Sequence, residues 1–430
     1  MCPVDLILAL LILFGVARLA GEGMERLHQS PMLGEVLAGI LLGPSLLGWI
    51  DPNPATGLGA SLGVVATLGI FVLVLLAGME LGREGLRQAF QERSAVVAAV
   101  EFILPFLLGY AFAGTLGFDV AHSLFLATAM AVTALPVSVR ILLDLNLLHS
   151  RLGRAIVSVA LANDLIAFAV LGLVVSLYNL GGGPLDPLAV AAVLLKIVGF
   201  VAFILLVGWA LARVGRAAGD GPSAMQRVLE RLKAPESAFA ICIALAFVLA
   251  TAAEALGIHF AVGVFYAGVL ITPQLVGREP FNQIRRSMSA VSFGLLTPVF
   301  FGFVGLQFTL NGASLPLILE VTAIGFVGKF VGGILGGLVA GFRGAPLVAL
   351  GVGLNARGMM ELILAQVGLA AGIIGPDLYS ALIVMTLVTT LVAPPVMKRL
   401  LRKFRLEDVM PAVALNGGRT RPSEDPAKPT

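Results

Sequence analysis

The sequence predicts an all-helical polytopic membrane protein with about 13 transmembrane helices, and three observations carry that prediction. Of its 430 residues, 58% are hydrophobic and only 12% are charged, whereas soluble domains carry about 25% charged residues. The mean hydropathy is +1.00. Apolar segments recur along the chain, and Lys and Arg occupy only every second break between them. This composition excludes a water-exposed globular surface, so lipid surrounds most of the chain.

Each predicted span has roughly 20 mostly apolar residues, the length that crosses a bilayer. Breaks marked by Gly, Pro or charged residues separate the spans. They form one transporter domain over residues 1–401, and residues 402–430 are expected to be a disordered cytoplasmic tail, because that segment is short and polar. The predicted spans are 3–20, 31–50, 58–79, 94–116, 121–145, 152–178, 187–212, 236–254, 258–275, 289–309, 314–340, 345–372 and 377–401.

The charged residues between the spans fix the expected orientation. The breaks after odd-numbered spans carry Lys or Arg, and the breaks after even-numbered spans carry none. Since Lys and Arg accumulate in cytoplasmic loops, the N-terminus is expected outside and the C-terminus in the cytoplasm of a cell (inner) membrane protein. The first span has no basic residue before it, unlike a signal peptide, and is expected to be retained.

Several functional classes are disfavoured by the same residues. The net charge of +3 reflects the sign bias of membrane loops, so nucleic acid is not an expected partner. The two cysteines, Cys2 and Cys242, provide neither a disulfide framework nor a CxxC metal site. No HExxH, GxSG or GxGD motif is present. An enzyme, a cofactor and a bound metal other than a transported cation are therefore not expected.

Ionisable residues inside the spans are the first candidates for function, because each costs about 2.5–3.5 kcal/mol on insertion scales. Glu101 has no partner visible in the sequence, and Lys196 can reach the membrane surface along its own side chain, so a structural role is the plainer interpretation for both. The candidates are Glu35, Glu101, Asp164, Lys196, Lys329, Arg357 and Glu361.

Asp164 is the strongest of these candidates. It lies in the middle of a span, in the segment SVALANDLIAFAV, directly after Asn163. Small residues at Ala160 and Ala162 allow neighbouring helices to approach closely. A carboxylate in this position can hold one monovalent cation or one proton, but hardly both. The sequence therefore indicates a site at which a cation and a proton compete.

Two spans are expected to be interrupted helices. In TAMAVTALPVSVRILLDL, Pro136 removes a backbone donor in mid-span, and Thr133 and Ser138 can bond the freed backbone groups. In GVGLNARGMMELILA, the interruption is marked by Gly353, Asn355 and Gly358, and a buried Arg357 stands four residues before Glu361. These two side chains share one helical face, so Arg357 can pair with Glu361 or neutralise carbonyl ends.

The interrupted spans are the fifth and the twelfth. Their separation of seven predicts two inverted six-helix repeats joined by a linker helix at 187–212. Crossed broken helices in inverted repeats are typical of secondary transporters, whose substrates bind near the middle of the membrane.

Three motifs then resemble one family in the same order along the chain. They are GEVLAGILLGPSLLG, MAVTALPVSVRILLDLNLL with SVALANDLIAF, and NARGMMELILAQVGL. Together they are similar to the monovalent cation/proton antiporter superfamily, and most similar to its branch of bacterial sodium/proton antiporters, Kef-type potassium efflux systems, and plant and fungal cation/proton exchangers. The resemblance implies a sodium/proton antiporter fold with dimerisation and core subdomains, a homodimer, and an elevator-like movement.

By this resemblance Asp164 matches the essential carboxylate, Asn163 the position before it, and Lys329 the basic residue of the core. The substrates it implies are H+ with Na+ or K+, with Asn163, Thr133 and backbone oxygens setting the choice of cation. Strongly electrogenic members have two adjacent aspartates, whereas this chain has Asn163 first. A single exchangeable carboxylate predicts one-for-one, electroneutral exchange. Lys329 is then left to pair with Asp164 or a backbone carbonyl, and its own deprotonation would restore electrogenicity.

Two other transport classes stay open at this point. A sodium-coupled symporter of an organic anion could use a related inverted-repeat fold, with Arg357 as the anion donor. A passive channel is less consistent with a single carboxylate and paired broken helices, because channels line their pores with rings of groups.

Overall fold

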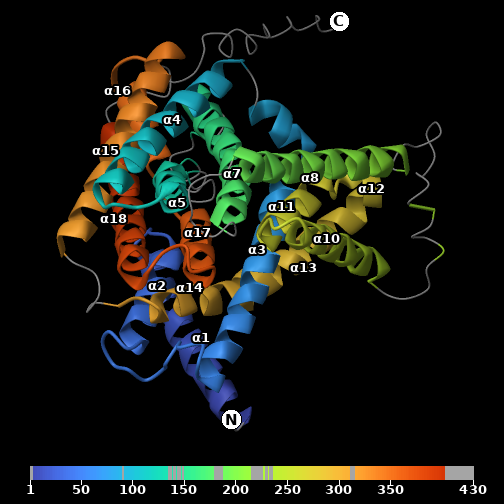
Figure 1. Ribbon diagram of the computed structural model, residues 1–430, viewed down its shortest axis with the longest axis horizontal. Helices are drawn as coiled ribbons and strands as arrows, with labels where there is room; N and C mark the ends of the chain where they lie inside the picture. Colours follow the sequence, from blue (N-terminus) through green and yellow to red (C-terminus); the bar gives the residue numbers. More distant parts are fainter. Residues whose placement is uncertain are drawn as a thin grey trace, which may run out of the picture.

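The computed structural model describes residues 3–89, 92–133, 150–178, 187–214, 236–309 and 315–401, with residues 138, 142, 147, 226, 227 and 231. Within these ranges the regular elements are helical (Figure 1). They are α1 (Pro3–Arg26), α2 (Pro31–Leu42), α3 (Gly57–Ala89), α4 (Glu92–Thr115), α5 (Val120–Ala131), α7 (Arg151–Tyr178), α8 (Pro187–Val214), α10 (Ser237–Ala255), α11 (Phe260–Leu270), α12 (Pro273–Val276), α13 (Arg278–Val291), η1 (Ser292–Leu296), α14 (Thr297–Leu306), α15 (Leu315–Val339), α16 (Gly344–Leu354), α17 (Met359–Ala370) and α18 (Pro376–Leu401).

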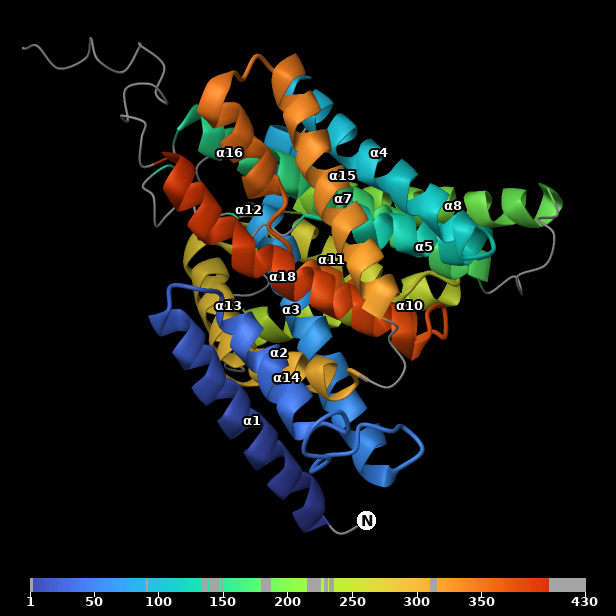
Figure 2. The same ribbon diagram turned by 90° about the vertical axis from the view of Figure 1, so that its left-hand side faces the viewer.

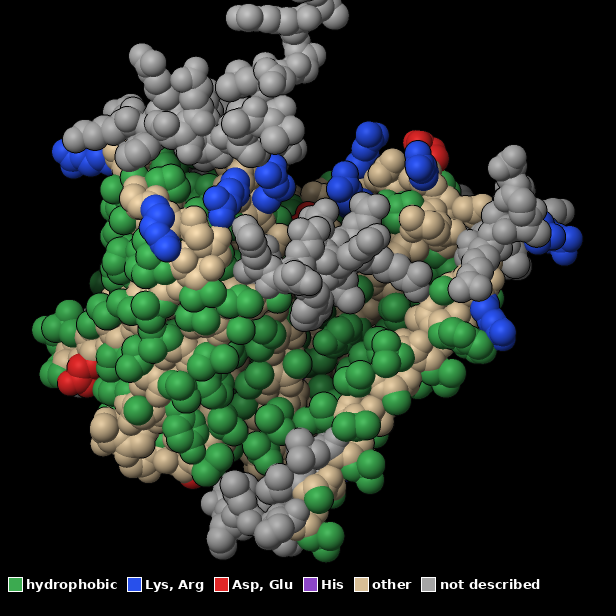
Figure 3. Space-filling view, turned by 90° about the horizontal axis from the view of Figure 1, so that it is seen from above, with side chains coloured by type: hydrophobic (Ala, Val, Ile, Leu, Met, Phe, Trp, Pro, Cys, Tyr) green, Lys and Arg blue, Asp and Glu red, His purple; other side chains and the backbone are tan. Residues whose placement is uncertain are grey.

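The chain is a multi-pass membrane protein. Among the described residues, 10 helices are long and apolar enough to cross a membrane, and α2, α5 and α11 are shorter apolar helices. Hydrophobic side chains cover a broad band of the surface, and Lys and Arg gather along its upper edge in Figure 3. The expected number of 13 spans stays a prediction, because residues between several helices lie outside the described ranges.

The helices pack in two groups. The first group, here called the core helices, comprises α4, α5, α7 and α15 to α18; α15 lies along α4, and α5 lies between α4 and α7. The second group, here called the scaffold helices, comprises α1 to α3 and α10 to α14 with η1. Figure 2 shows α4, α15, α16 and α18 on one side and α1, α2 and α14 on the other. The long helix α8 lies beside α7, α10 and α11.

Within the scaffold helices, early helices of the chain pack closely on late ones at two crossings. Helix α2 packs on α14, where a Cβ added to Gly39 would come within 1.9 Å of the Gly302 carbonyl oxygen. Helix α11 packs on α3, where a Cβ added to Gly78 would come within 2.2 Å of the Phe265 carbonyl oxygen. Glycine is required at such crossings, because any side chain would separate the backbones. The exchange of partners between early and late helices agrees with the predicted inverted repeat, which itself stays a prediction.

Several element boundaries differ from the sequence prediction, and two of them have a clear local cause. The helix expected over 31–50 ends at Leu42, because Gly43 is extended and precedes Pro44, which disfavours helical geometry in the residue before it. The loop expected before residue 289 is instead helix α13, whose apolar residues Phe281, Ile284 and Met288 are buried. Hydropathy alone misses such a helix, because its exposed face is polar. The tail after residue 401 lies outside the described residues.

Candidate functional site

The middle of α7 carries the two residues that the sequence favours most. Asp164 is 6% exposed, Asn163 is fully buried, and both belong to the core helices. The Oδ1 atoms of both side chains are buried and have no hydrogen-bond partner among the described residues. Buried polar atoms are nearly always satisfied in proteins. These two unsatisfied oxygens therefore provide ligands that a cation or a proton can use.

Glu101, in α4, lies at the centre of a buried network beside these oxygens. It forms an ion pair with Lys329 of α15. Its Oε1 accepts a hydrogen bond from the Thr133 hydroxyl at 3.0 Å, and its Oε2 accepts one from the Asn163 amide at 2.5 Å. The same amide nitrogen lies 3.0 Å from the Thr133 Oγ1. Because the Asn163 nitrogen faces Glu101 and Thr133, the Asn163 carbonyl oxygen is directed elsewhere.

The packing of α15 against α4 explains why Glu101 meets Lys329. Glycines recur every four residues along one face of α15, at Gly328, Gly332 and Gly336. A Cβ added to Gly332 would lie 3.1 Å from the Glu101 Cα. This stripe of small residues lets the two helices touch along their backbones. The closeness brings the carboxylate of one helix to the ammonium of the other.

Two cationic side chains bind the C-terminal end of α5, which is a short apolar helix of 12 residues. The Nη1 and Nη2 atoms of Arg357 donate to the carbonyl oxygens of Ala129 at 2.8 Å and Met130 at 2.6 Å. The Lys329 ammonium donates to the carbonyl oxygen of Ala131. The last carbonyls of a helix lack intrahelical partners and carry partial negative charge. Arg357 and Lys329 together satisfy all three of these carbonyl groups.

Arg357 lies in the break between α16 and α17, which spans residues 355–358. Its Nη1 atom also donates to Glu361 Oε1 at 3.1 Å. The Asn355 amide donates to the Phe326 carbonyl at 3.0 Å, and the Thr390 hydroxyl donates to the Arg357 carbonyl at 2.7 Å. Thr390 of α18 thus satisfies a backbone carbonyl that the break leaves open, and Asn355 ties the break to α15, as a non-helical segment at membrane depth requires.

The structure brings together most of the residues that the sequence singles out. Thr133 and Lys329 join Asn163 around Glu101, while Gly353 lies within α16 and accepts a hydrogen bond from Ser138 at 3.1 Å through its carbonyl oxygen. Gly358 precedes the first residue of α17. Pro136 lies outside the described residues.

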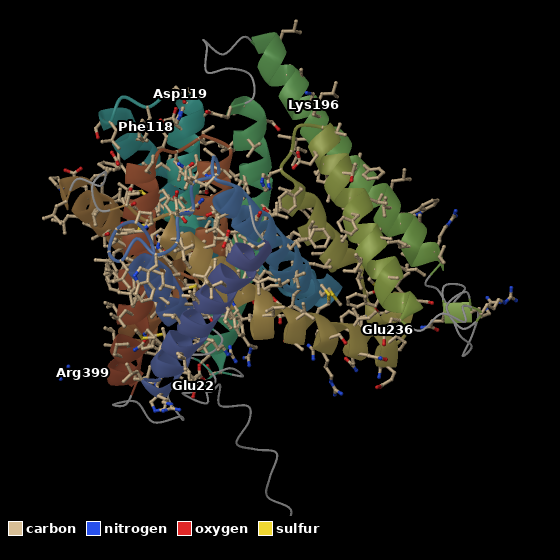
Figure 4. All side chains as sticks on the ribbon, turned by 90° about the horizontal axis from the view of Figure 1, so that it is seen from below. Glu22, Phe118, Asp119, Lys196, Glu236 and Arg399 are labelled. Atoms are coloured by element: carbon tan, nitrogen blue, oxygen red, sulfur yellow. The ribbon has the colours of Figure 1, made fainter. Side chains whose placement is uncertain are left out.

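One expectation about the charged residues changes. Lys329 pairs with the carboxylate of Glu101 and not with Asp164, and it also binds the backbone carbonyl of Ala131, which is the other partner that the sequence allows. Glu101, for which the sequence shows no partner, is therefore a buried ion-pair residue. Lys196 is exposed on α8 and lies at the same end of the molecule as Asp119, opposite Glu22 and Arg399, in Figure 4.

The formal charges at the site do not balance. Three carboxylates, on Glu101, Asp164 and Glu361, face two cations, Lys329 and Arg357. Glu101 and Glu361 each have an ion-pair partner, so the surplus negative charge falls on Asp164. One monovalent cation or one proton brings the site to neutrality. Such a site, in a bundle of membrane helices beside the break between α16 and α17, defines a secondary transporter of a small cation.

Comparison with known proteins gives the family. The family model described as "Sodium/hydrogen exchanger, transmembrane" matches residues 8–403, and the chain belongs to this family. It is 29% identical to the Na+/H+-K+ antiporter GerN of Bacillus cereus over 89% of this chain and 92% of GerN. It is 27% identical to an Na+/H+ antiporter of Enterococcus hirae over 92% of this chain and 98% of that protein.

Two further likenesses concern a plant protein and a solved structure. The chain is 30% identical to the cation/H+ antiporter 18 of Arabidopsis thaliana over 93% of its own length, which is 49% of the plant protein. Its fold matches the sodium proton antiporter MjNhaP1 from Methanocaldococcus jannaschii with a TM-score of 0.67, over 93% of this chain and 97% of that one, at 15% identity. The sodium/proton antiporter fold expected from the sequence is thereby confirmed.

Proposed function

We propose that this protein exchanges one monovalent cation, Na+ or K+, for one proton across the cell membrane, and that Asp164 binds the two in turn. Family membership and the named relatives, which are cation/proton antiporters, support the class of activity. The N-terminus outside, the C-terminus in the cytoplasm and a homodimeric assembly complete the proposal. Asn163 and Thr133 contribute oxygen ligands beside Asp164.

One observation carries the proposal. The Asp164 Oδ1 atom has no hydrogen-bond partner among the described residues, whereas the other two carboxylates are paired, Glu101 with Lys329 and Glu361 with Arg357. The ion pair with Glu101 favours the charged form of Lys329, so the cycle that we propose releases no proton from this lysine. The site is then neutral when it holds a cation and neutral when it holds a proton. Both loaded forms cross the membrane without carrying net charge, so the exchange is electroneutral.

The rival symporter of an organic anion receives less support. Its anion would need free donors, and Arg357 is the residue named for that purpose. The Nη1 and Nη2 atoms of Arg357 already donate to three backbone carbonyls and to Glu361, which leaves only the buried Nε–H without a partner among the described residues. The side chain is fully buried, and a negatively charged substrate would meet a site with surplus negative charge.

Reconstitution tests this proposal. Purified protein in proteoliposomes with a pH-sensitive dye inside is expected to move protons when Li+, Na+, K+ or Rb+ is added outside, with no organic co-substrate. Asp164→Asn is expected to abolish this exchange, because it removes the group for which cation and proton compete. The variant is expected to keep the unfolding temperature of the parent. Exchange at the parental rate in folded Asp164→Asn would remove Asp164 from the mechanism.

A further inference from the structure

The boundary between the core helices and the scaffold helices is largely apolar where α7 faces α11. Phe168 of α7 stacks on Phe265 of α11, with ring centroids 4.4 Å apart. One turn further along α7, a Cβ added to Gly172 would lie 3.1 Å from the Ile258 Cγ2 atom. Apolar contacts of this kind have no directional preference. They let two surfaces slide without breaking any specific bond.

Three side chains interrupt this apolar boundary with hydrogen bonds. The Ser176 hydroxyl of α7 donates to the Gly257 carbonyl at 3.0 Å. The Tyr379 hydroxyl of α18 donates to the Val304 carbonyl of α14 at 2.9 Å. The backbone N–H of Thr309 donates to Ser380 Oγ at 3.1 Å. Among the residues that the structure describes, these are the side-chain hydrogen bonds that join core helices to scaffold helices.

All three bonds lie at the same end of the helices. Ser176 is in the last turn of α7, and Tyr379 and Ser380 are in the first turn of α18. Gly257 follows the end of α10, and Val304 is in the last turn of α14. The breaks at this end contain no Lys or Arg, which makes it the end assigned to the outside of the cell.

We propose that Ser176, Tyr379 and Ser380 form an outer latch, which holds the core against the scaffold at the outer end and so sets how often the cation site faces outward. The proposal rests on the proposed function, since only a site with alternating access needs such a bias. The three side chains position the core and take no part in binding the ion.

The partners on the scaffold suit a latch that opens reversibly. Each is a backbone group beyond or within the last turn of a helix, where intrahelical partners are missing. Water can replace each partner when the outer end opens, so each bond makes only a modest net contribution to the free energy of the closed form. A net value typical of protein hydrogen bonds corresponds to about a 2- to 10-fold shift in the ratio of closed to open forms for each bond.

Tyr379 also links the latch to the site. Its hydroxyl lies 3.3 Å from the Gln366 Oε1 atom, and Gln366 belongs to α17, the half-helix that carries Glu361 near its start. Because the hydroxyl has one proton and two acceptors within reach, it can pass from the Val304 carbonyl to Gln366 as the latch opens. The released hydroxyl would then keep a partner inside the core.

The test measures the distance across the outer end directly. Nitroxide labels are placed at two exposed positions, Ala255→Cys on α10 and Asp377→Cys on α18, after replacement of Cys2 and Cys242 by Ser. Pulsed electron spin resonance of the full-length protein in lipid nanodiscs gives the populations of short and long distances. The variants are Ser176→Ala, Tyr379→Phe, Ser380→Ala and the triple combination. Each must keep a monodisperse, folded state by size and thermal unfolding.

Two matched controls remove similar hydrogen bonds without crossing the boundary. Tyr178→Phe removes a bond to the Gly372 carbonyl between two core helices, and Ser45→Ala removes a bond to the Phe308 carbonyl inside the scaffold. The long-distance population is expected to rise about 2- to 10-fold in each single latch variant and by more than tenfold in the triple variant. It is expected to stay unchanged in both controls.

Unchanged distances in the triple variant would overturn the latch, and so would an equal shift in the controls. The readout needs neither cation nor proton flux. A protein that shows the expected distances but no exchange would contradict the proposed function while leaving the latch intact. A protein that exchanges ions but keeps one distance in every variant would contradict the latch alone.

Discussion

Glu101 and Lys329 depend on each other because both are fully buried. In Glu101→Gln the Lys329 ammonium keeps its place but loses its counter-charge. A buried charge left without its partner typically costs about 3–5 kcal/mol of stability. We therefore expect a large drop in the unfolding temperature, measured by differential scanning fluorimetry in detergent. The control Glu22→Gln removes an exposed pair with Arg26 and is expected to change stability little.

The double variant Glu101→Gln with Lys329→Met separates pairing from packing. It removes both charges, so most of the lost stability is expected to return. If the double variant instead loses as much stability as the two single variants together, the two side chains do not interact as the structure indicates.

At the scale of single residues, the sequence locates Asp164, Asn163 and Lys329 but not the role of Glu101. An ionisable residue inside a span is easy to recognise in the sequence, because placing a charged side chain in lipid costs free energy and such residues are rare there. Which residue it meets depends on the faces that two distant helices turn toward each other. The glycine stripe of α15 carries part of that information, since it marks the face that contacts a neighbour. Nothing in the sequence names α4 as that neighbour.

The contact between α15 and α4 is tested by adding volume to the stripe. Gly332→Val places a branched side chain where a Cβ alone would already lie 3.1 Å from the Glu101 Cα. The helices must separate, which weakens the ion pair behind them, so we expect lower stability and slower exchange. Gly199→Ala in α8 is the control, because a Cβ there meets no atom within 4 Å. Equal behaviour of the two variants would contradict the close contact.

The start of α5 offers a test that depends on pH. Asp119 caps this helix through the His122 backbone N–H at 2.9 Å. Burial raises the pKa of Asp119, but the hydrogen bonds and charge of His122 outweigh it and hold that pKa below its ordinary value. The cap thus contributes stability at neutral pH and loses it as pH falls through the depressed pKa.

Asp119→Ala is expected to cost about 1 kcal/mol at pH 7 and progressively less below about pH 4, where the parent also loses its carboxylate. Asp119→Asn keeps a capping oxygen but loses the charge, so its stability at pH 7 is expected to lie between that of the parent and that of Asp119→Ala. Thermal unfolding at a series of pH values checks both. A cost for Asp119→Ala that stays the same at acid pH would rule out the charged cap.

At the scale of elements, hydropathy predicts where apolar helices lie better than where they end. It finds the long spans, because each needs about 20 apolar residues. It misses α13, whose polar face hides three buried residues, and it extends α2 beyond the Gly43–Pro44 stop. Individual residues such as Gly43 and Pro44 decide these boundaries, and hydropathy averaged over a window of sequence does not detect their effect.

At the scale of the whole molecule, charge governs both sidedness and mechanism. Lys and Arg side chains gather at one edge of the apolar band (Figure 3), as the sequence predicts for the cytoplasmic side. The packing of early helices on late ones, α2 on α14 and α11 on α3, could not be derived from periodicity, because it joins segments that are far apart in the sequence. The resemblance to a known family predicted the overall fold but did not name these pairs of helices.

The net charge carried in one transport cycle is the most direct test of the mechanism. Proteoliposomes adsorbed on a solid-supported membrane receive a step in Na+ or K+ concentration, while a dye inside reports the protons exchanged. Electroneutral exchange at Asp164 predicts a change in internal pH with no steady current above that of Asp164→Asn. A steady current that rises with the proton flux and disappears in Asp164→Asn would contradict one-for-one exchange.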